Sequence, residues 1–441
     1  MQVSTGKIDI TPATGHPMAG YGVDAPRLST GVNEPLCARC TILWDEGVPH
    51  AIVTVDVLGF RHAAHDSIRT RVGALGIATD AFALTATHTH NGPVLSEGLD
   101  AYIAYDIVDL TSVMQYTDHL LDAIVQLVAD TMVAPRADCT LDYFVLDEDF
   151  SFNREGLPGD ERDVPTLVAR ALDGSPLVVL FGYAAHPVAG GLQYLFDPDY
   201  PAQAIKQIEA AYDGVFAQFL LGPAGDQNPK DQPGFEGSDA YGADLGDTIV
   251  NAIDVPGRPV SGPLECHYTE VSLPLDITLS PANFVGVRAD FAARALNTLL
   301  PGYERRHALR MVSLIDTTPL AALETTIALP VQRWRFAGDP DFTIVFCGGE
   351  VVSGIAHQAT SPNGGTENVW FLGYSNEIPA YIPGDDLLNH PCYAGGVDQD
   401  YPGIGGGSMT VYDHLAHFRP TRPVTGDGAE RVLLNHIATL V

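Results

Sequence analysis

The chain has 441 residues, of which 46% are hydrophobic and 18% are charged, a composition that buries a substantial core and excludes disordered and fibrous proteins. Its 55 acidic residues outnumber its 23 basic residues and give a formal net charge of −32. Such a charge repels phosphate backbones and anionic lipid, so it argues against nucleic-acid binding and against membrane docking through a basic patch.

The N-terminal residues 1–10 lack the apolar core of a secretory signal. The longest apolar run, residues 176–185, has about half the length of a bilayer-spanning helix. We therefore expect a cytoplasmic protein without a stable membrane anchor. Six cysteines are too few for a disulfide framework in a chain of this length, and the single CxxC, Cys37 and Cys40, is expected to be a pair of buried structural thiols.

Several apolar, β-branched runs predict strands, and each is followed within a few positions by a polar residue. These runs occupy residues 51–55, 81–87, 176–185, 215–221 and 342–347. The polar residues that follow them are Asp56, His88, His186, Asp226 and Glu350. Near-continuous apolar strands are typical of sheets that helices cover on both faces.

Four segments between these strands have helical periodicity or helix-start signals. They cover residues 117–132, 201–211, 238–253 and 280–296, with Pro201, Ser238 and the pair Ser280-Pro281 as start signals. Residues 139–146 and 266–275 are expected to form antiparallel strands. We predict one α/β domain over residues 1–441, with mixed buried sheets, flanking helices and long loops rich in Gly and Pro.

Ligands bind at the carboxyl ends of strands in open α/β sheets, and the polar residues at those ends include a possible metal-ligand set. Two histidines and one glutamate, His88, His186 and Glu350, match the three protein ligands of a catalytic zinc site. Each residue alone has an ordinary interpretation. A single histidine after an apolar strand is usually structural, and a glutamate at the start of a helix complements the helix dipole.

The motif Thr87-His88-Thr89-His90-Asn91-Gly92-Pro93 strengthens the metal hypothesis. Residues at i and i+2 on an extended strand point to the same side, and Gly92-Pro93 would turn the chain so that both imidazoles face a cavity. The alternative is a pair of loop histidines that hydrogen-bond to backbone carbonyl groups.

The order of several motifs resembles the catalytic portion of the neutral/alkaline (non-lysosomal) ceramidases, which are zinc amidases that cleave an N-acyl bond. The resemblance extends over nearly the whole chain. The matching segments are Gly6-Lys7-Ile8-Asp9-Ile10-Thr11-Pro12, Thr87 to Pro93, Phe152-Asn153-Arg154, Tyr183-Ala184-Ala185-His186-Pro187, Gly349-Glu350, and Ser375-Asn376 followed by Tyr381 and Tyr393.

The resemblance implies a role for each matching residue. His88, His186 and Glu350 would bind one Zn²⁺ per chain, with Tyr381 as a fourth, phenolic ligand or close neighbour. His90, Arg154, Tyr381 and Tyr393 would act on the substrate. Without the resemblance, the two tyrosines would be interpreted as half-buried aromatic residues and Arg154 as a surface or salt-bridge residue.

The sequence also departs from the family. Gln227 stands where the family has a serine, so a serine nucleophile at that position is absent and metal-activated water is favoured. Residues 377–379 are Glu-Ile-Pro, where the family has Asn-Thr-Tyr. The sequence also stops soon after Tyr393, without the family's C-terminal β-sandwich. These differences point away from ceramide itself and toward another amide.

We therefore predict a zinc-dependent hydrolase that cleaves a linear N-acyl amide of a small-molecule substrate with metal-activated water. The tyrosine hydroxyls and Arg154 would stabilise the oxyanion, His90 would transfer the proton, and Asp56 or Asp226 would orient a ligand. The same site would also suit esters, lactones or cyclic amides. A non-catalytic binding protein that retains the fold is the alternative from another class.

Overall fold

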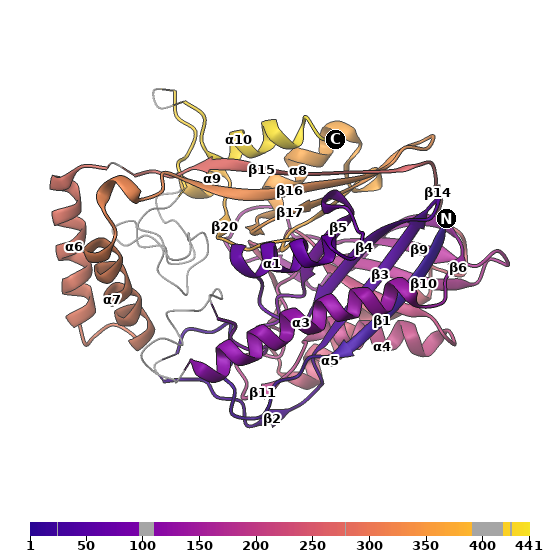
Figure 1. Cartoon of the computed structure of the whole chain (residues 1–441), viewed down its shortest axis with the longest axis horizontal. Helices are drawn as coiled ribbons and strands as arrows, with labels where there is room; N and C mark the ends of the chain where they lie inside the picture. The colour runs from indigo at the N-terminus through magenta and orange to yellow at the C-terminus, as the bar shows by residue number, and fades with distance from the viewer. Residues whose placement is uncertain (24, 97–109, 278, 390–417, 424–425) are drawn as a thin grey trace.

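The computed structural model describes residues 1–23, 25–96, 110–277, 279–389, 418–423 and 426–441. In this part of the chain, three large sheets that mix parallel and antiparallel pairs have helices packed against them (Figure 1). The mixed α/β class predicted from the sequence is confirmed.

The first sheet contains the N-terminal strands and is covered by two helices. Its order is β5-β4-β3-β1-β6, in which only β4 and β5 pair in parallel. The strands are β1 (Gln2–Asp9), β3 (Cys37–Asp45), β4 (Val48–Val55), β5 (Phe82–Ala86) and β6 (Ala137–Asp138). Helix α3 (Thr111–Val133) packs on β1 and β3, and α1 (His62–Gly73) packs beside α3.

The second sheet has the order β12-β10-β9-β7-β14, with a parallel pair between β10 and β12. Its strands are β7 (Thr140–Asp147), β9 (Asp163–Arg170), β10 (Pro176–Tyr183), β12 (Phe216–Leu221) and β14 (Arg258–Val260). Helix α4 (Tyr200–Ala211) packs on β12, and α5 (Phe235–Val250) packs on α4.

The third sheet has the order β15-β16-β17-β19, and its parallel pair is β17 with β19. Its strands are β15 (Leu264–Pro274), β16 (Thr326–Phe336), β17 (Phe342–Cys347) and β19 (Val369–Leu372). Helix α8 (Ser353–Thr360) packs on β19, and α10 (Ala429–Ile437) packs on β15 and α8.

Shorter elements complete the described structure. Three two-stranded pairs join distant segments: β2 (Gly31–Val32) with β11 (Leu195–Phe196), β8 (Ser151–Asn153) with β13 (Gln227–Pro229), and β18 (Glu350–Val351) with β20 (Tyr381–Ile382). The helices α6 (Pro281–Leu296) and α7 (Gly302–Thr317) form a hairpin at one end of the molecule (Figure 1). The remaining helices are α9 (Asp385–Leu388) and the 3₁₀ turns η1 (Thr79–Ala81), η2 (Leu320–Ala322), η3 (Ser361–Asn363) and η4 (Gly365–Glu367).

The three sheets share a buried interior. Ile52 from the first sheet, Leu180 from the second, and Trp334 and Trp370 from the third belong to one hydrophobic cluster, each 2% exposed or less. Burial of such large side chains contributes roughly 1.5–3 kcal/mol each. The packing brings the carboxyl ends of β5, β10 and β17 together, and the polar residues that follow them lie at this junction.

The predicted helices are present with shifted ends. Residues 238–253 were expected to form a helix with Ser238 as its cap, whereas α5 begins at Phe235 after Gly234, which has φ of 90°. The prediction of Ser238 as a cap is wrong, because its hydroxyl donates to Asp199 instead. Among the described residues, no helix has both the length and the hydrophobicity that crossing a bilayer requires.

Candidate metal centre

His88 begins the site two residues after β5. Its φ of 62° is unusual for a residue with a side chain, so the chain turns at His88 itself, and it bends again at Gly92, where the sequence suggested a turn. The side chain is 1% exposed, and Nδ1 donates a hydrogen bond to the carbonyl of Leu58. A carbonyl can only accept, so Nδ1 carries a proton, and Nε2 is the nitrogen that faces the interior.

His186 follows β10 and is fixed in the same way. Its Nδ1 donates to the Gln227 carbonyl at 3.0 Å, and its backbone N–H donates to that same oxygen at 2.9 Å. The side chain is fully buried. Burial, with the nearby Arg154 charge, lowers the pKa of His186 to about 4, so Nε2 carries a lone pair at neutral pH.

Glu350, the first residue of β18, completes the group. Its Oε2 lies 3.2 Å from His88 Nε2 and 3.1 Å from His186 Nε2, and the side chain is 1% exposed. Burial alone would raise the pKa of this carboxyl, but the two imidazoles outweigh burial and hold it well below its usual range. The glutamate is therefore a buried carboxylate.

The Nε2 atoms of two imidazoles and one carboxylate oxygen thus converge in a buried site, an arrangement that suits a shared cation. A tetrahedral zinc site with bonds of about 2.0–2.1 Å places neighbouring ligand atoms about 3.3–3.4 Å apart, close to the separations from Glu350 Oε2. The second nitrogen of each imidazole is held by a backbone carbonyl, which is the usual support for a metal-binding histidine. The donor set therefore fits a divalent metal.

Tyr381 and Arg154 lie beside this group. The Tyr381 hydroxyl is 3.4 Å from His186 Nε2 and accepts a 3.2 Å hydrogen bond from the Arg154 guanidinium. The same guanidinium nitrogen donates to the Gly225 carbonyl at 2.7 Å. The structure thus brings together His88, His186, Glu350, Tyr381 and Arg154, which come from five separate segments.

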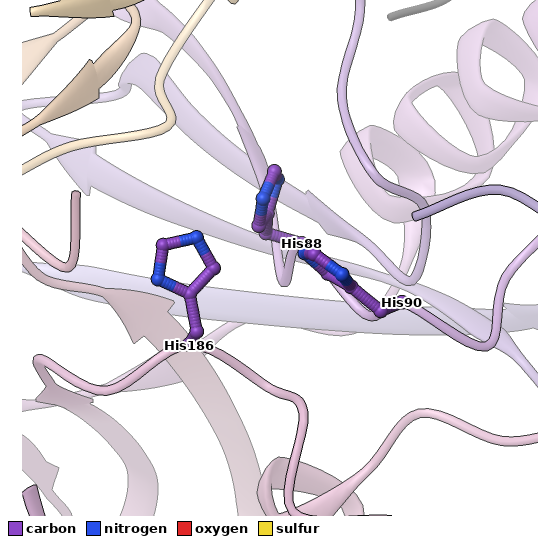
Figure 2. Close-up of side chains that lie close together, drawn as sticks. All are labelled: His88, His90 and His186. Atoms are coloured by element: carbon purple, nitrogen blue, oxygen red, sulfur yellow. The ribbon is translucent and has the colours of Figure 1, made fainter. Parts of the chain in front are cut away.

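His90 is the third histidine of the group. Figure 2 shows its ring beside those of His88 and His186, and the ring centroids are 5.0 and 5.6 Å away. One nitrogen of each of the three rings lies within 4.8 Å of the others. Both His90 ring nitrogens are buried without a hydrogen-bond partner, and burial, with the neighbouring histidines, lowers its pKa well below the usual value. His90 is therefore a neutral imidazole at the site.

Arg27, which the sequence did not single out, holds the loop that carries His90. Its guanidinium, 2% exposed, donates to the carbonyl groups of Ala19 and His90 and to Asn91 Oδ1. It also lies over the Tyr21 ring, whose edge contacts His90. The buried guanidinium therefore ties its own loop to the two loops that carry Ala19 and His90. An isolated arginine in a Pro/Ser-containing loop gives no sequence signal for this role.

Two predicted orienting residues, Asp56 and Asp226, bond to neighbouring backbone and side-chain groups instead of to an imidazole. Asp56 accepts hydrogen bonds from the Thr87 hydroxyl and the Cys37 backbone, and burial raises its pKa to about 6. Asp226 accepts from the Asn153 amide and from Ser353, and its carbonyl accepts from the Arg154 N–H. Asp226 therefore supports Arg154. Tyr393 lies outside the described residues.

Gln227 joins several segments of the site through its side chain and its backbone. Its side chain bonds to Ser151, Gly159 and Ser353, while its carbonyl holds His186. A second tyrosine that sequence reasoning missed, Tyr374, also reaches the centre: its hydroxyl is 3.4 Å from both Glu350 Oε2 and His186 Nε2.

Comparison with known proteins identifies the fold. No family model matches the sequence, and no curated protein matches it. A solved structure of a ceramidase complexed with C2 is 18% identical, covers 87% of this chain and 70% of its own, and has a TM-score of 0.64. The neutral ceramidase from Pseudomonas aeruginosa is 19% identical, with coverage of 93% and 71% and a TM-score of 0.66. The chain therefore has the neutral ceramidase fold, as the motifs predicted.

Proposed function

We propose that the protein is a metal-dependent hydrolase that cleaves a linear N-acyl amide with water, and that it holds one Zn²⁺ per chain. The observation that carries the proposal is the approach of His88 Nε2 and His186 Nε2 to within 3.2 Å of Glu350 Oε2 in a buried site. The likeness to ceramidase structures supports amide cleavage as the reaction.

A divalent ion at this position supplies two things when bound: it lowers the pKa of a water molecule toward neutrality and polarises the carbonyl of the substrate. His88, His186 and Glu350 hold the ion. The carbonyls of Leu58 and Gln227 keep both imidazoles in the tautomer that offers Nε2.

The remaining residues act on the substrate. The carbonyl oxygen of the substrate gains negative charge as water attacks. Arg154 and the Tyr381 hydroxyl, which are hydrogen-bonded to each other, are the donors that stabilise this charge. His90, a neutral imidazole, accepts a proton from the attacking water and passes it to the leaving nitrogen. We assign residues 1–441 to one catalytic unit, because the ligands come from all three sheets.

Metal analysis and substrate comparison test the proposal. We expect about one zinc per purified chain, loss of activity after chelation and recovery when zinc is restored. A panel of N-acyl amides, each paired with its matched ester, should show faster turnover of an amide. A protein that is active only on esters or lactones would contradict the amide assignment. A fully metal-free protein that still hydrolyses amides would contradict the mechanism.

A further inference from the structure

Tyr374 occupies a position in the centre that neither the motifs nor the proposed roles include. Its side chain is 1% exposed, and its hydroxyl oxygen lies 3.4 Å from Glu350 Oε2 and 3.4 Å from His186 Nε2. Its ring packs on the His88 ring with centroids 4.5 Å apart. Tyr374 thus contacts all three residues that are expected to hold the ion.

The backbone of Tyr374 joins the strands that carry two of these ligands. Its N–H donates to the Gly349 carbonyl at 3.0 Å, one residue before Glu350, and its carbonyl accepts from the Ala86 N–H at 3.1 Å, two residues before His88. The residue has φ of 52°. A bulky residue in this region is strained, and such strain is concentrated at functional sites.

The distances from the Tyr374 hydroxyl oxygen distinguish a metal ligand from a hydrogen-bond partner. An O–H···O hydrogen bond usually spans about 2.5–3.0 Å, so 3.4 Å is long for a bond from Tyr374 to Glu350. The same 3.4 Å matches the edge of a tetrahedron with zinc–ligand bonds of about 2.0–2.1 Å. The Tyr374 oxygen therefore lies where a neighbouring ligand atom of the same ion would lie.

We propose that the phenol oxygen of Tyr374 is an additional ligand of the metal ion. The proposal rests on the proposed metal site. When the ion binds, the phenol O–H bond breaks, an oxygen–metal bond forms, and the proton passes to the solvent. The centre then offers the ion two imidazole nitrogens, one carboxylate oxygen and the Tyr374 oxygen, and the Tyr381 oxygen lies beside them, 3.4 Å from His186 Nε2.

The test combines zinc affinity with a count of ionised phenols. In Tyr374→Phe the ring still packs on His88, so we expect a folded protein whose zinc affinity is at least about tenfold lower, by competition with a chelator. The ultraviolet difference spectrum on zinc addition should show one fewer tyrosinate per chain than the wild type shows. Tyr143→Phe is the matched control, because the buried Tyr143 hydroxyl donates to the Thr366 carbonyl outside the metal centre.

Three results distinguish the possibilities. Equal zinc affinity and equal tyrosinate counts in wild type and Tyr374→Phe would overturn this inference and leave the metal site intact. A wild type that binds no divalent ion would overturn the proposed function as well. If Tyr374→Phe does not fold, Tyr381→Phe decides: a tyrosinate signal that persists on zinc addition supports Tyr374 as a ligand, and its absence refutes it.

Discussion

The Arg154 guanidinium donates a 3.2 Å hydrogen bond to the Tyr381 hydroxyl, and its carbon lies 5.5 Å from the centre of the Tyr381 ring. The Arg154 N–H is held by the Asp226 carbonyl and the guanidinium by the Gly225 carbonyl. The arginine is therefore fixed before any substrate arrives, and it polarises the tyrosine hydroxyl at the edge of the metal centre. A preorganised donor of this kind stabilises developing charge without reorganisation.

The first prediction concerns this pair. Arg154→Lys keeps the positive charge but loses the planar group that reaches both Gly225 and Tyr381. We expect kcat on an N-acyl amide to fall about 10²- to 10³-fold, as for loss of an oxyanion donor, with zinc content unchanged. Arg170→Lys is the control, since buried Arg170 pairs with Asp142 and should affect stability instead of kcat. Loss of zinc from Arg154→Lys would contradict the assignment.

The second prediction concerns the carboxylate of the candidate metal centre, Glu350. Glu350→Gln keeps the shape but removes the negative charge, and its amide N–H can donate to an imidazole lone pair. Because changes next to a metal ligand already cost 10- to 100-fold in affinity, we expect zinc affinity to fall by about 100-fold or more. Elemental analysis and chelator competition measure this effect.

The control for Glu350→Gln is Glu377→Gln. Glu377 is also buried, and its carboxylate accepts from His62 Nδ1 at 3.0 Å. This variant should keep its zinc. Full zinc binding by Glu350→Gln would mean that the ion is held without this residue, by a group such as the three histidines.

The sequence predicted much of this site because its candidate ligands follow strand ends. His88, His186 and Glu350 come after β5, β10 and β17, and the carboxyl ends of these strands meet where the three sheets pack. The apolar runs predict both the strands and their buried packing. The polar residue that ends each run is therefore a local signal with a predictable position in space.

Other features of the site leave no such signal. Tyr374 reaches the centre because of a positive φ and two backbone hydrogen bonds to distant strands, and a single sequence encodes neither feature locally. Arg27 acts from an irregular loop on carbonyl oxygens, which every residue has. The turn at His88 is a tertiary effect: local propensity favours an extended strand end, whereas packing imposes φ of 62°.

The third prediction concerns pH. Burial raises the pKa of Asp197 to about 7, against a smaller lowering effect of the Asn33 hydrogen bond. Because the folded state then binds the proton more tightly than the unfolded state, Asp197 should destabilise the protein as pH rises from about 4 to about 7. Asp197→Asn should remove this dependence, with a gain at pH 8 of at most about 4 kcal/mol, since one pKa unit corresponds to about 1.4 kcal/mol.

The Asn33 side chain can rotate to present its oxygen to the new amide, so the hydrogen bond at 2.7 Å need not be lost. Urea unfolding at pH 5 and pH 8, with wild type and variant both metal-free, gives the comparison. An unchanged pH dependence in Asp197→Asn would show that this carboxyl is ionised in the folded protein throughout the range.

The fourth prediction concerns Gly225, the residue between Arg154 and β18. A Cβ at this position would lie 2.5 Å from the Glu350 carbonyl oxygen and 2.9 Å from that of Val351, and both contacts are with backbone. Gly225→Ala should therefore displace β18, lower stability by about 1–3 kcal/mol and weaken zinc binding, because Glu350 moves with its strand.

Gly354→Ala is the matched control: it lies in α8 with open space around its Cβ, and alanine there should stabilise the helix by up to about 1 kcal/mol. Thermal unfolding and zinc competition on both variants separate the local clash from a general effect of the methyl group. If Gly225→Ala binds zinc like the wild type, the position of Glu350 does not depend on the close contact between these two segments.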